Sequence, residues 1–531
     1  MAQAYTAIPQ GSLYNIPEAL PQGLLYRYKK ISNISRQNMK IPSNNGQGDV
    51  WAGQKIIVTL PSNALIDLST FTMDFKGYTQ HNGANGTTGP LNYCQSRFFP
   101  RNTQSLIETM EIKIGGQTRS LINNYGYIYN ILNDYTTGTD ATNKNRIGQN
   151  ADPSCKYYYS KSGIRRRCGF PLGLTTDPKL ANDLDDYTIR NWLGFFQGST
   201  SIIDTSMFGQ IDLEISLAPA GVLMLGKKPD ATTIANITQA NSEIGLDIPS
   251  VATHGSILAA EGTSYKLSDI TFNMVRYDLP RAVTDAMTAV LASNAVYQYW
   301  FPSYTSFMGQ PVAGNKTGTT RISISTSSLD MLIGTFMVQN RDTQAYPVLG
   351  NHDSYYLSTQ ASAEYGQKDK TFRSAIQNAA PVCFNQSKYF VRNGTTLKQC
   401  RWGIGNVYFN YETIPDQFSN VLRAFNTQND TLGGFHEGLT SLAAFQDTYY
   451  AHILTLNASG ENDIYTVSGL DASTLPCQIS WEYVGGDDAT NANDWPEIYD
   501  ATNNNIHTPL IIAVYSAHLD IMANRQIITR V

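Results

Sequence analysis

Charged residues are scarce in this 531-residue chain. Asp, Glu, Lys and Arg together make up 15% of it, whereas about a quarter is usual for soluble proteins. The formal net charge is −5, so the chain as a whole lacks the positive surface with which proteins neutralise nucleic-acid phosphates. This composition argues against bulk nucleic-acid binding and leaves room only for a local contact.

Long apolar runs and paired cysteines are also missing. The longest apolar candidate, residues 510–517, is much shorter than the ~20 residues of a membrane-spanning helix. Residues 1–10 have neither the basic start nor the apolar core of a signal peptide, so we expect a chain that is made and used without secretion. The six cysteines form no CxxC pair, which argues against a disulfide framework and a structural zinc site. We expect free thiols in a reducing compartment.

The motifs of several enzyme classes are incomplete. Residues 403–405 lack the third glycine of a dinucleotide-binding loop, and residues 314–317 lack the upstream glycine of a P-loop. The pair at 436–437 is not followed by the second histidine of a zinc protease, and no GxSxG nucleophile elbow occurs. The acidic clusters at 183–186 and 487–488 lack the ligand spacing of an EF-hand. The sequence therefore predicts no catalytic residue, no cofactor and no metal ion.

Uncharged polar residues and tyrosine take the place of charge. Tyr occurs 32 times, and hydrophobic residues make up 41% of the chain, enough to bury a core in each of two domains. Tyr gives a large, stiff, amphipathic contact area that suits extensive protein–protein packing. An equally simple explanation is that β-proteins favour Tyr and Thr.

Residues 106–135 are the stretch around which the chain is organised. Met110, Ile112 and Ile114 alternate with polar residues as in a strand with one buried face. The pair at 115–116 supplies a turn, and the apolar residues that follow have the spacing of a helix: Leu121, Tyr125, Ile128, Tyr129 and Leu132. A similar strand and helix start recur at 407–425, so we expect two similar halves.

Other segments repeat between the halves in the same order. Residues 210–217 and 477–484 alternate between apolar and polar side chains, and each of these segments is followed by a polar loop and a long final strand, at 265–277 and 509–521. Residues 331–338 are nearly all apolar and are expected to be buried on both sides.

We therefore predict an all-β fold with short strands, long polar loops and few short helices. About eight strands in each half fit two tandem jelly-roll sandwiches, although this pattern also fits other sandwich topologies. The predicted divisions are an N-terminal arm at 1–48, a first jelly roll at 49–279 and a second at 280–531. A short helix at 281–292 marks the boundary.

Two basic segments are candidate contact sites. The first is the arm, whose five basic residues could meet a phosphate backbone, an anionic membrane or a protein partner: Arg27, Lys29, Lys30, Arg36 and Lys40. A solvated or partner-bound arm is the simpler interpretation. The second is Arg165-Arg166-Arg167, which could contact nucleic acid or a neighbour's carboxylates, or form a solvated turn.

The duplicated halves, the strand-Gly-Gly-helix unit at 112–132, the linker helix after Tyr277 and the final strand at 510–521 together resemble a double jelly-roll major capsid protein. The resemblance is to the capsid proteins of polinton-like viruses and virophages, and next to those of the nucleocytoplasmic large DNA viruses. It implies a non-enzymatic subunit of the virion that forms a homotrimer of six-sided outline, a capsomer that tiles an icosahedral shell.

The resemblance also implies partners. These are further copies of the chain, neighbouring capsomers, penton and minor capsid proteins, and no small-molecule substrate. The basic arm would point inward, toward the genome or an internal membrane, and the long loops would rise on the outer face.

Two alternatives from other classes remain open. A two-domain β-sandwich rich in Asn, Tyr and Trp also suits carbohydrate binding. A sandwich-fold glycoside hydrolase needs two carboxylates that face each other across a cleft. Glu111 and Glu482 lie on predicted strands, but nothing in the sequence pairs them.

Overall fold

The structure is a computed structural model of the chain. It describes residues 35–45, 48–81, 97–100, 102–136, 157–159, 165–167, 185–225, 263–278, 289, 296–313, 317–338, 388–390, 392, 394, 397–405, 407–413, 416–421, 445, 449–456, 469–473, 479–485, 506–522 and 526–531.

The first half consists of two facing antiparallel sheets. One has the strand order β1-β14-β4-β10, with β2 and β11 paired at its margins, and the other has the order β3-β12-β6-β7. The strands of the first sheet are β1 (Ser35–Pro42), β2 (Val50–Trp51), β4 (Leu65–His81), β10 (Asp185–Ile189), β11 (Ile202–Asp204) and β14 (Thr263–Asp278). Those of the second are β3 (Lys55–Thr59), β6 (Ile107–Ile114), β7 (Gln117–Asn123) and β12 (Ile211–Leu217).

The second half has the same plan. One sheet runs β15-β23-β18-β21, with β16 and β24 paired to β23, and the other runs β17-β22-β19-β20. The strands of the first of these sheets are β15 (Tyr297–Met308), β16 (Val312–Ala313), β18 (Leu329–Val338), β21 (His452–Thr455), β23 (Ile506–Ile521) and β24 (Ile527–Arg530). Those of the second are β17 (Gly318–Ile322), β19 (Leu397–Ile404), β20 (Val407–Thr413) and β22 (Ile479–Gly485).

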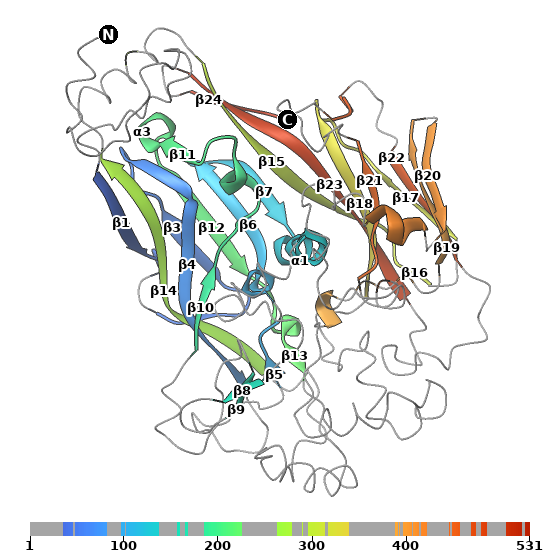
Figure 1. Cartoon of the computed structure of the whole chain (residues 1–531), viewed down its shortest axis with the longest axis horizontal. Helices are drawn as coiled ribbons and strands as arrows, with labels where there is room; N and C mark the ends of the chain where they lie inside the picture. The colour runs from blue at the N-terminus through green and yellow to red at the C-terminus, as the bar shows by residue number, and fades with distance from the viewer. Residues whose placement is uncertain are drawn as a thin grey trace, which may run out of the picture.

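Each half is therefore a jelly roll. If the eight main strands of a half are counted in chain order, one sheet has the order 1-8-3-6 and the other the order 2-7-4-5, in both halves. Two sheets of this kind form the eight-stranded double Greek key. The predicted all-β double jelly roll is confirmed. The two rolls lie side by side along the long axis of the molecule, with β1 at one end and β20 at the other (Figure 1).

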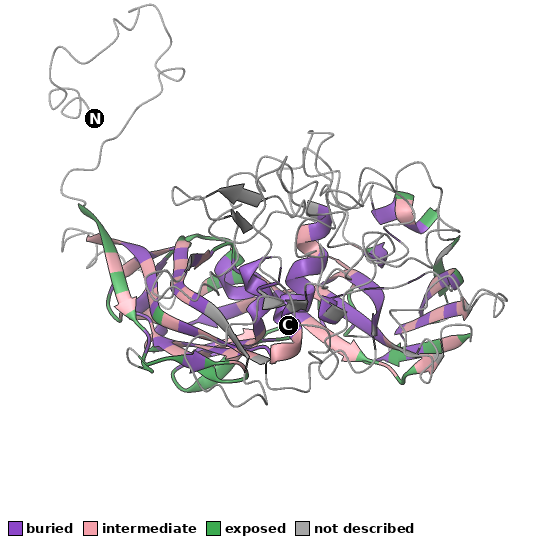
Figure 2. Cartoon of the chain, turned by 90° about the horizontal axis from the view of Figure 1, so that it is seen from below, coloured by how far each residue is buried: buried purple, intermediate pink, exposed green. Residues whose placement is uncertain are grey.

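The core lies between the two sheets of each half. In β12 the residues at 211, 213, 215 and 217 are buried and those between them are only partly buried, as the alternation predicts. In β22 Ile479, Trp481 and Tyr483 are buried in the same way, and residues 332–337 of β18 are all buried. Buried positions run through both halves and also through the region between them (Figure 2).

The expected helix around Leu121 is wrong at its start. Residues 117–123 form the strand β7, which pairs with β6 to make a hairpin with Gly115 and Gly116 at its turn. The helix α1 (Tyr125–Thr136) begins only after Asn124. Leu121 is 43% exposed on β7, so its apparent helical spacing to Tyr125 was accidental.

The second half repeats this hairpin and helix. β19 and β20 are joined at Gly405, and residues 416–421 are helical. Thr413 donates a hydrogen bond from its hydroxyl to Asp416 at 2.7 Å just before this helix.

Short elements connect the strands. They are the helix α3 (Thr205–Phe208), the 3₁₀ turns η3 (Thr103–Leu106), η4 (Gly194–Gln197), η5 (Ala220–Val222) and η7 (Lys388–Phe390), and the strand pairs β5 (Arg97–Phe98) with β13 (Met224–Leu225) and β8 (Tyr157–Tyr159) with β9 (Arg165–Arg167). Of the expected linker helix at 281–292, only Ala289 belongs to the described residues, and it is helical. The domain boundary at 279/280 stays a prediction.

Candidate assembly surfaces

Aromatic side chains form one part of the joint between the halves. Tyr299 on β15 donates a hydrogen bond from its hydroxyl to the carbonyl of Phe195 in η4, at 2.6 Å, and the two rings lie 5.0 Å apart. Tyr304 donates to Gln197 at 3.0 Å. Burial raises the pKa of both tyrosines, so they remain neutral donors. A Cβ on Gly198 would lie 2.0 Å from the Tyr299 ring, so the close approach of the two halves requires glycine there.

A buried ion pair forms the second part of the joint. Arg392 of the second half donates a hydrogen bond to Asp134 of α1 at 2.7 Å, and both side chains are fully buried. Burial alone lowers the pKa of the guanidinium, but Asp134 and the neighbouring tyrosines outweigh it, so the pKa lies above its usual value. Tyr135 beside this pair donates its hydroxyl to the carbonyl of Tyr449. A buried pair of this kind tolerates little displacement, because losing either partner leaves an uncompensated charge.

The edges of the two halves also meet at the joint. β7 lies beside β15, and Asn124 donates a hydrogen bond to Ser306 at 3.0 Å. The backbone N–H of Ser199 donates to the carbonyl of Trp300 at 2.7 Å, which satisfies a group on the free edge of β15. Together with the ion pair, these contacts fix the two jelly rolls into one block.

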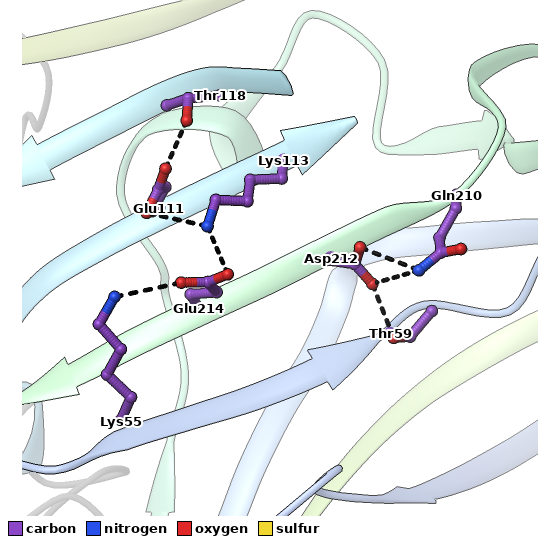
Figure 3. A network of polar contacts seen from close by, with 8 residues as sticks. All are labelled: Lys55, Thr59, Glu111, Lys113, Thr118, Gln210, Asp212 and Glu214. Carbon is purple, nitrogen blue, oxygen red and sulfur yellow. Dashed lines mark hydrogen bonds and ion pairs between the residues drawn. The ribbon is translucent and has the colours of Figure 1, made fainter. Parts of the chain in front are cut away.

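The outward face of the β3-β12-β6-β7 sheet is covered by a network of charges (Figure 3). Glu111 and Glu214 lie directly opposite each other on β6 and β12, and Lys113 contacts both, at 3.6 and 2.5 Å. Lys55 reaches Glu214 from β3 at 3.3 Å. The hydrogen bond from Lys113 is the main reason why the pKa of Glu214 is lowered. The network therefore turns a repulsive pair of carboxylates into a polar outer surface.

The equivalent sheet of the second half has a different outer face. Arg401 on β19 pairs with Glu482 on β22 at 2.5 Å, and its guanidinium lies 3.9 Å from the centre of the Tyr408 ring. One ion pair and an aromatic ring stand here where the first half has two lysines and two glutamates. Glu111 and Glu482, the pair considered for a glycosidase, therefore lie on different sheets, and each is held by a cation.

β20 has an apolar free edge. Val407, Tyr408 and Phe409 follow one another and are 56%, 56% and 37% exposed. In the described part of the chain β20 pairs only with β19. Exposed apolar residues on an edge strand are typical of surfaces that contact another chain.

The opposite end of the molecule is the edge strand β1. In the described part of the chain it pairs only with β14. Met39 and Ile41 pack against the core, whereas Arg36 and Lys40 are exposed. The predicted arm at 1–48 is therefore wrong for residues 35–42, which belong to a sheet because alternate side chains reach the core. The other candidate arm residues lie outside the described residues: Arg27, Lys29 and Lys30.

The arginine triplet forms the strand β9, whose backbone pairs with the tyrosine strand β8. Arg165, Arg166 and Arg167 stand opposite Tyr159, Tyr158 and Tyr157 in register. Their proposed contact with nucleic acid or a neighbour stays a prediction.

Among the residues that the structure describes, no group of three or more His, Cys, Asp or Glu side chains is placed to hold a metal ion. None of the helices described is long and apolar enough to cross a membrane.

Sequence reasoning missed the surfaces that matter here. Asp134, Arg392 and Tyr299 come together only through the tertiary fold, and no local pattern marks them. Val407, Tyr408 and Phe409 did carry a signal, because a strand that is apolar at consecutive positions must either lie inside a sheet or expose an apolar face.

Comparison with solved structures shows the same fold over the whole length. The VP54 protein of the virus PBCV-1, fitted into a reconstruction of the virophage Sputnik, has a TM-score of 0.52 at 11% identity, with 96% of this chain and 99% of VP54 covered. A quasi-atomic model of the PBCV-1 virus capsid gives 0.51 at 10% identity, with 95% and 98% covered. No protein-family model matches the chain, and no curated protein matches it in sequence.

Proposed function

We propose that this chain is a major capsid protein of a DNA virus, a structural subunit without catalysis. Three copies form a capsomer of pseudo-hexagonal outline, and capsomers tile an icosahedral shell in the virion. One of the two similar structures is a model of a virus capsid, which supports this role. Its partners are further copies of itself, with penton and minor capsid proteins at special positions of the shell.

One observation carries the proposal. The chain contains the same jelly roll twice, with the same strand order in both sheets, and a buried ion pair joins the two rolls. Three such chains supply six similar blocks, and a closed ring of blocks buries contact surface on every side without leaving a free end. The low content of charge, 15%, favours dense packing of identical copies because it limits repulsion between them.

The basic N-terminal segment is proposed to face the interior of the shell. Arg36 and Lys40 are exposed on β1, and Arg27, Lys29 and Lys30 precede that strand in the sequence. A local basic segment on a chain with a net charge of −5 suits a confined contact with the genome or an anionic internal membrane, rather than binding along the whole surface.

Size-exclusion chromatography with light scattering, followed by negative-stain microscopy, tests the proposal. We expect a stable species of three times the 58.7 kDa chain mass, seen as six-sided particles. A chain that stays monomeric at micromolar concentration and binds a glycan array would instead establish a carbohydrate-binding protein. Hydrolysis of a chromogenic sugar that is abolished by a single Glu→Gln change would establish a glycosidase.

A further inference from the structure

The two edge hairpins of the molecule have turns of the same length and the same register beside the turn. In the first half Ile114 pairs with Gln117 across the turn, and in the second half Ile404 pairs with Val407. Both turns have two residues, beginning with Gly115 and Gly405 in the left-handed conformation. The first two residues after each turn therefore correspond, Gln117 and Thr118 to Val407 and Tyr408. Arg119 then lies at a β-bulge, so that Ser120 pairs with Ile112 as Phe409 pairs with Trp402.

The first of these hairpins is already used within the chain. β7 lies beside β15, and Arg119 donates a hydrogen bond to Thr529 of the second half at 3.3 Å. β15 is the first strand of its half, at the margin of its larger sheet, and β1 holds the same position in the first half. The contact is thus between strand five of one jelly roll and strand one of the next.

The second hairpin and β1 are equivalent to the two strands of this contact, β7 and β15, but they lie too far apart to contact each other within one chain. β20 presents its three exposed apolar side chains at one end of the molecule, and β1 presents an exposed edge at the other end (Figure 1). When copies of a chain associate head to tail through two different surfaces, they form a closed ring or an open filament, depending on the rotation between neighbouring copies.

We propose that β20 of one copy docks beside β1 of a second copy, so that the contact between chains repeats the contact of β7 with β15 within the chain. This inference rests on the proposed function, because closure after three copies makes all six contacts of the ring alike. The contact residues are Val407, Tyr408 and Phe409 of one copy and the strand Ser35–Pro42 of the next.

The chain itself supplies the sharpest variant. Replacing Val407→Gln, Tyr408→Thr and Phe409→Ser gives the second hairpin the residues that the first has at the equivalent paired positions, Gln117, Thr118 and Ser120. We expect the variant to fold, as judged by circular dichroism and its melting transition, and to lose the trimer peak in light scattering. Leu121→Gln is the matched control, because Leu121 is similarly exposed, at 43%, on the equivalent strand β7; it should leave the trimer intact.

Cysteine crosslinking tests the contact even if the triple variant misfolds. A chain with Asn38→Cys and Tyr408→Cys should form covalent trimers under mild oxidation, seen on a non-reducing gel. Chains with only one of these changes, or with Asn38→Cys and Leu121→Cys, should give none.

The outcomes separate the two proposals. A wild-type chain that remains monomeric overturns the proposed function. A wild-type trimer combined with an intact trimer in the triple variant, or with no crosslink between positions 38 and 408, overturns the β20–β1 contact and leaves the capsid role standing.

Discussion

The hairpins β6–β7 and β19–β20 share one backbone plan and have different side chains. The residues that follow the turn are polar in the first half, where they are Gln117, Thr118 and Arg119, and apolar in the second, where they are Val407, Tyr408 and Phe409. The first contact is made within one chain, so covalent connection keeps its partners at high effective concentration. A contact between separate copies must also overcome the loss of translational freedom, about 4–15 kcal/mol. The fold therefore determines where an edge strand lies, whereas the side chains of that strand determine whether it suits a contact within the chain or a contact with another copy.

The largest effect is expected from removing the ion pair of the joint, because it stabilises the contact between the two halves of one chain. Asp134→Asn leaves the guanidinium of Arg392 buried without its counter-charge, and we expect a loss of about 3–5 kcal/mol in the free energy of unfolding, measured by chemical denaturation. Asp134→Leu combined with Arg392→Met removes both charges and should recover most of this loss. If the single change has no measurable effect, the ion pair does not hold the halves together.

A smaller effect is expected at the aromatic part of the joint. Tyr299→Phe removes the hydrogen bond to the buried carbonyl of Phe195, which should cost about 1–3 kcal/mol of stability. Tyr297→Phe is the control, since the hydroxyl of Tyr297 pairs with Thr200 at an exposed place of the same joint and its loss should change stability by at most about 0.5 kcal/mol. Equal thermal shifts for the two variants would show that burial of the Tyr299 hydrogen bond adds nothing to the joint.

The smallest effect sharpens the contrast between the outer faces of the equivalent sheets. The pKa of Glu214 is lowered in the folded protein, first by its hydrogen bond with Lys113. Its contribution to stability is therefore present above the ordinary value of 4.5 and is lost as the pH falls through the lower, folded value. Glu214→Gln should lower stability by at most about 1 kcal/mol at pH 7, and the two melting curves should converge in acid. A difference that persists at low pH would assign the effect to packing instead of charge.

Much of the strand framework could be predicted from the sequence because burial leaves a period of two. The alternation of Ile211, Leu213 and Ile215 and that of Ile479, Trp481 and Tyr483 both placed their strands with the correct inward face. The same periodicity failed at Leu121, where a short strand and a helix follow each other so closely that their apolar residues fit one helical stripe. The choice of jelly roll over other sandwiches needed the pairing of β1 with β14, residues far apart in the chain.

The candidate site was less predictable for a related reason. Arg392 and Asp134 lie 258 positions apart, and each is an ordinary charged residue in its local sequence. They become important for stability because both charges lose their water in the joint, and the joint exists only when both halves are folded. The apolar residues of β20 were visible as a strand, but their exposure follows from the position of β20 at the margin of its sheet, which sequence periodicity does not reveal.

The pairing of the first strand of each jelly roll with its last also constrains how the protein matures. Met39 pairs with Met274, and Tyr304 pairs with Val514. The larger sheet of each half therefore cannot form completely until almost all of that half has left the ribosome. Long-range pairings of this kind make folding slow, and domains generally fold as units during synthesis, beginning from the N-terminus. The end that carries β1 is consequently completed before the end that carries β20, whose sheet needs β22 (Ile479–Gly485). During translation the sheet that contains β1 is thus complete long before the sheet that contains β20. Contact between copies through these two strands is therefore delayed until translation is nearly over.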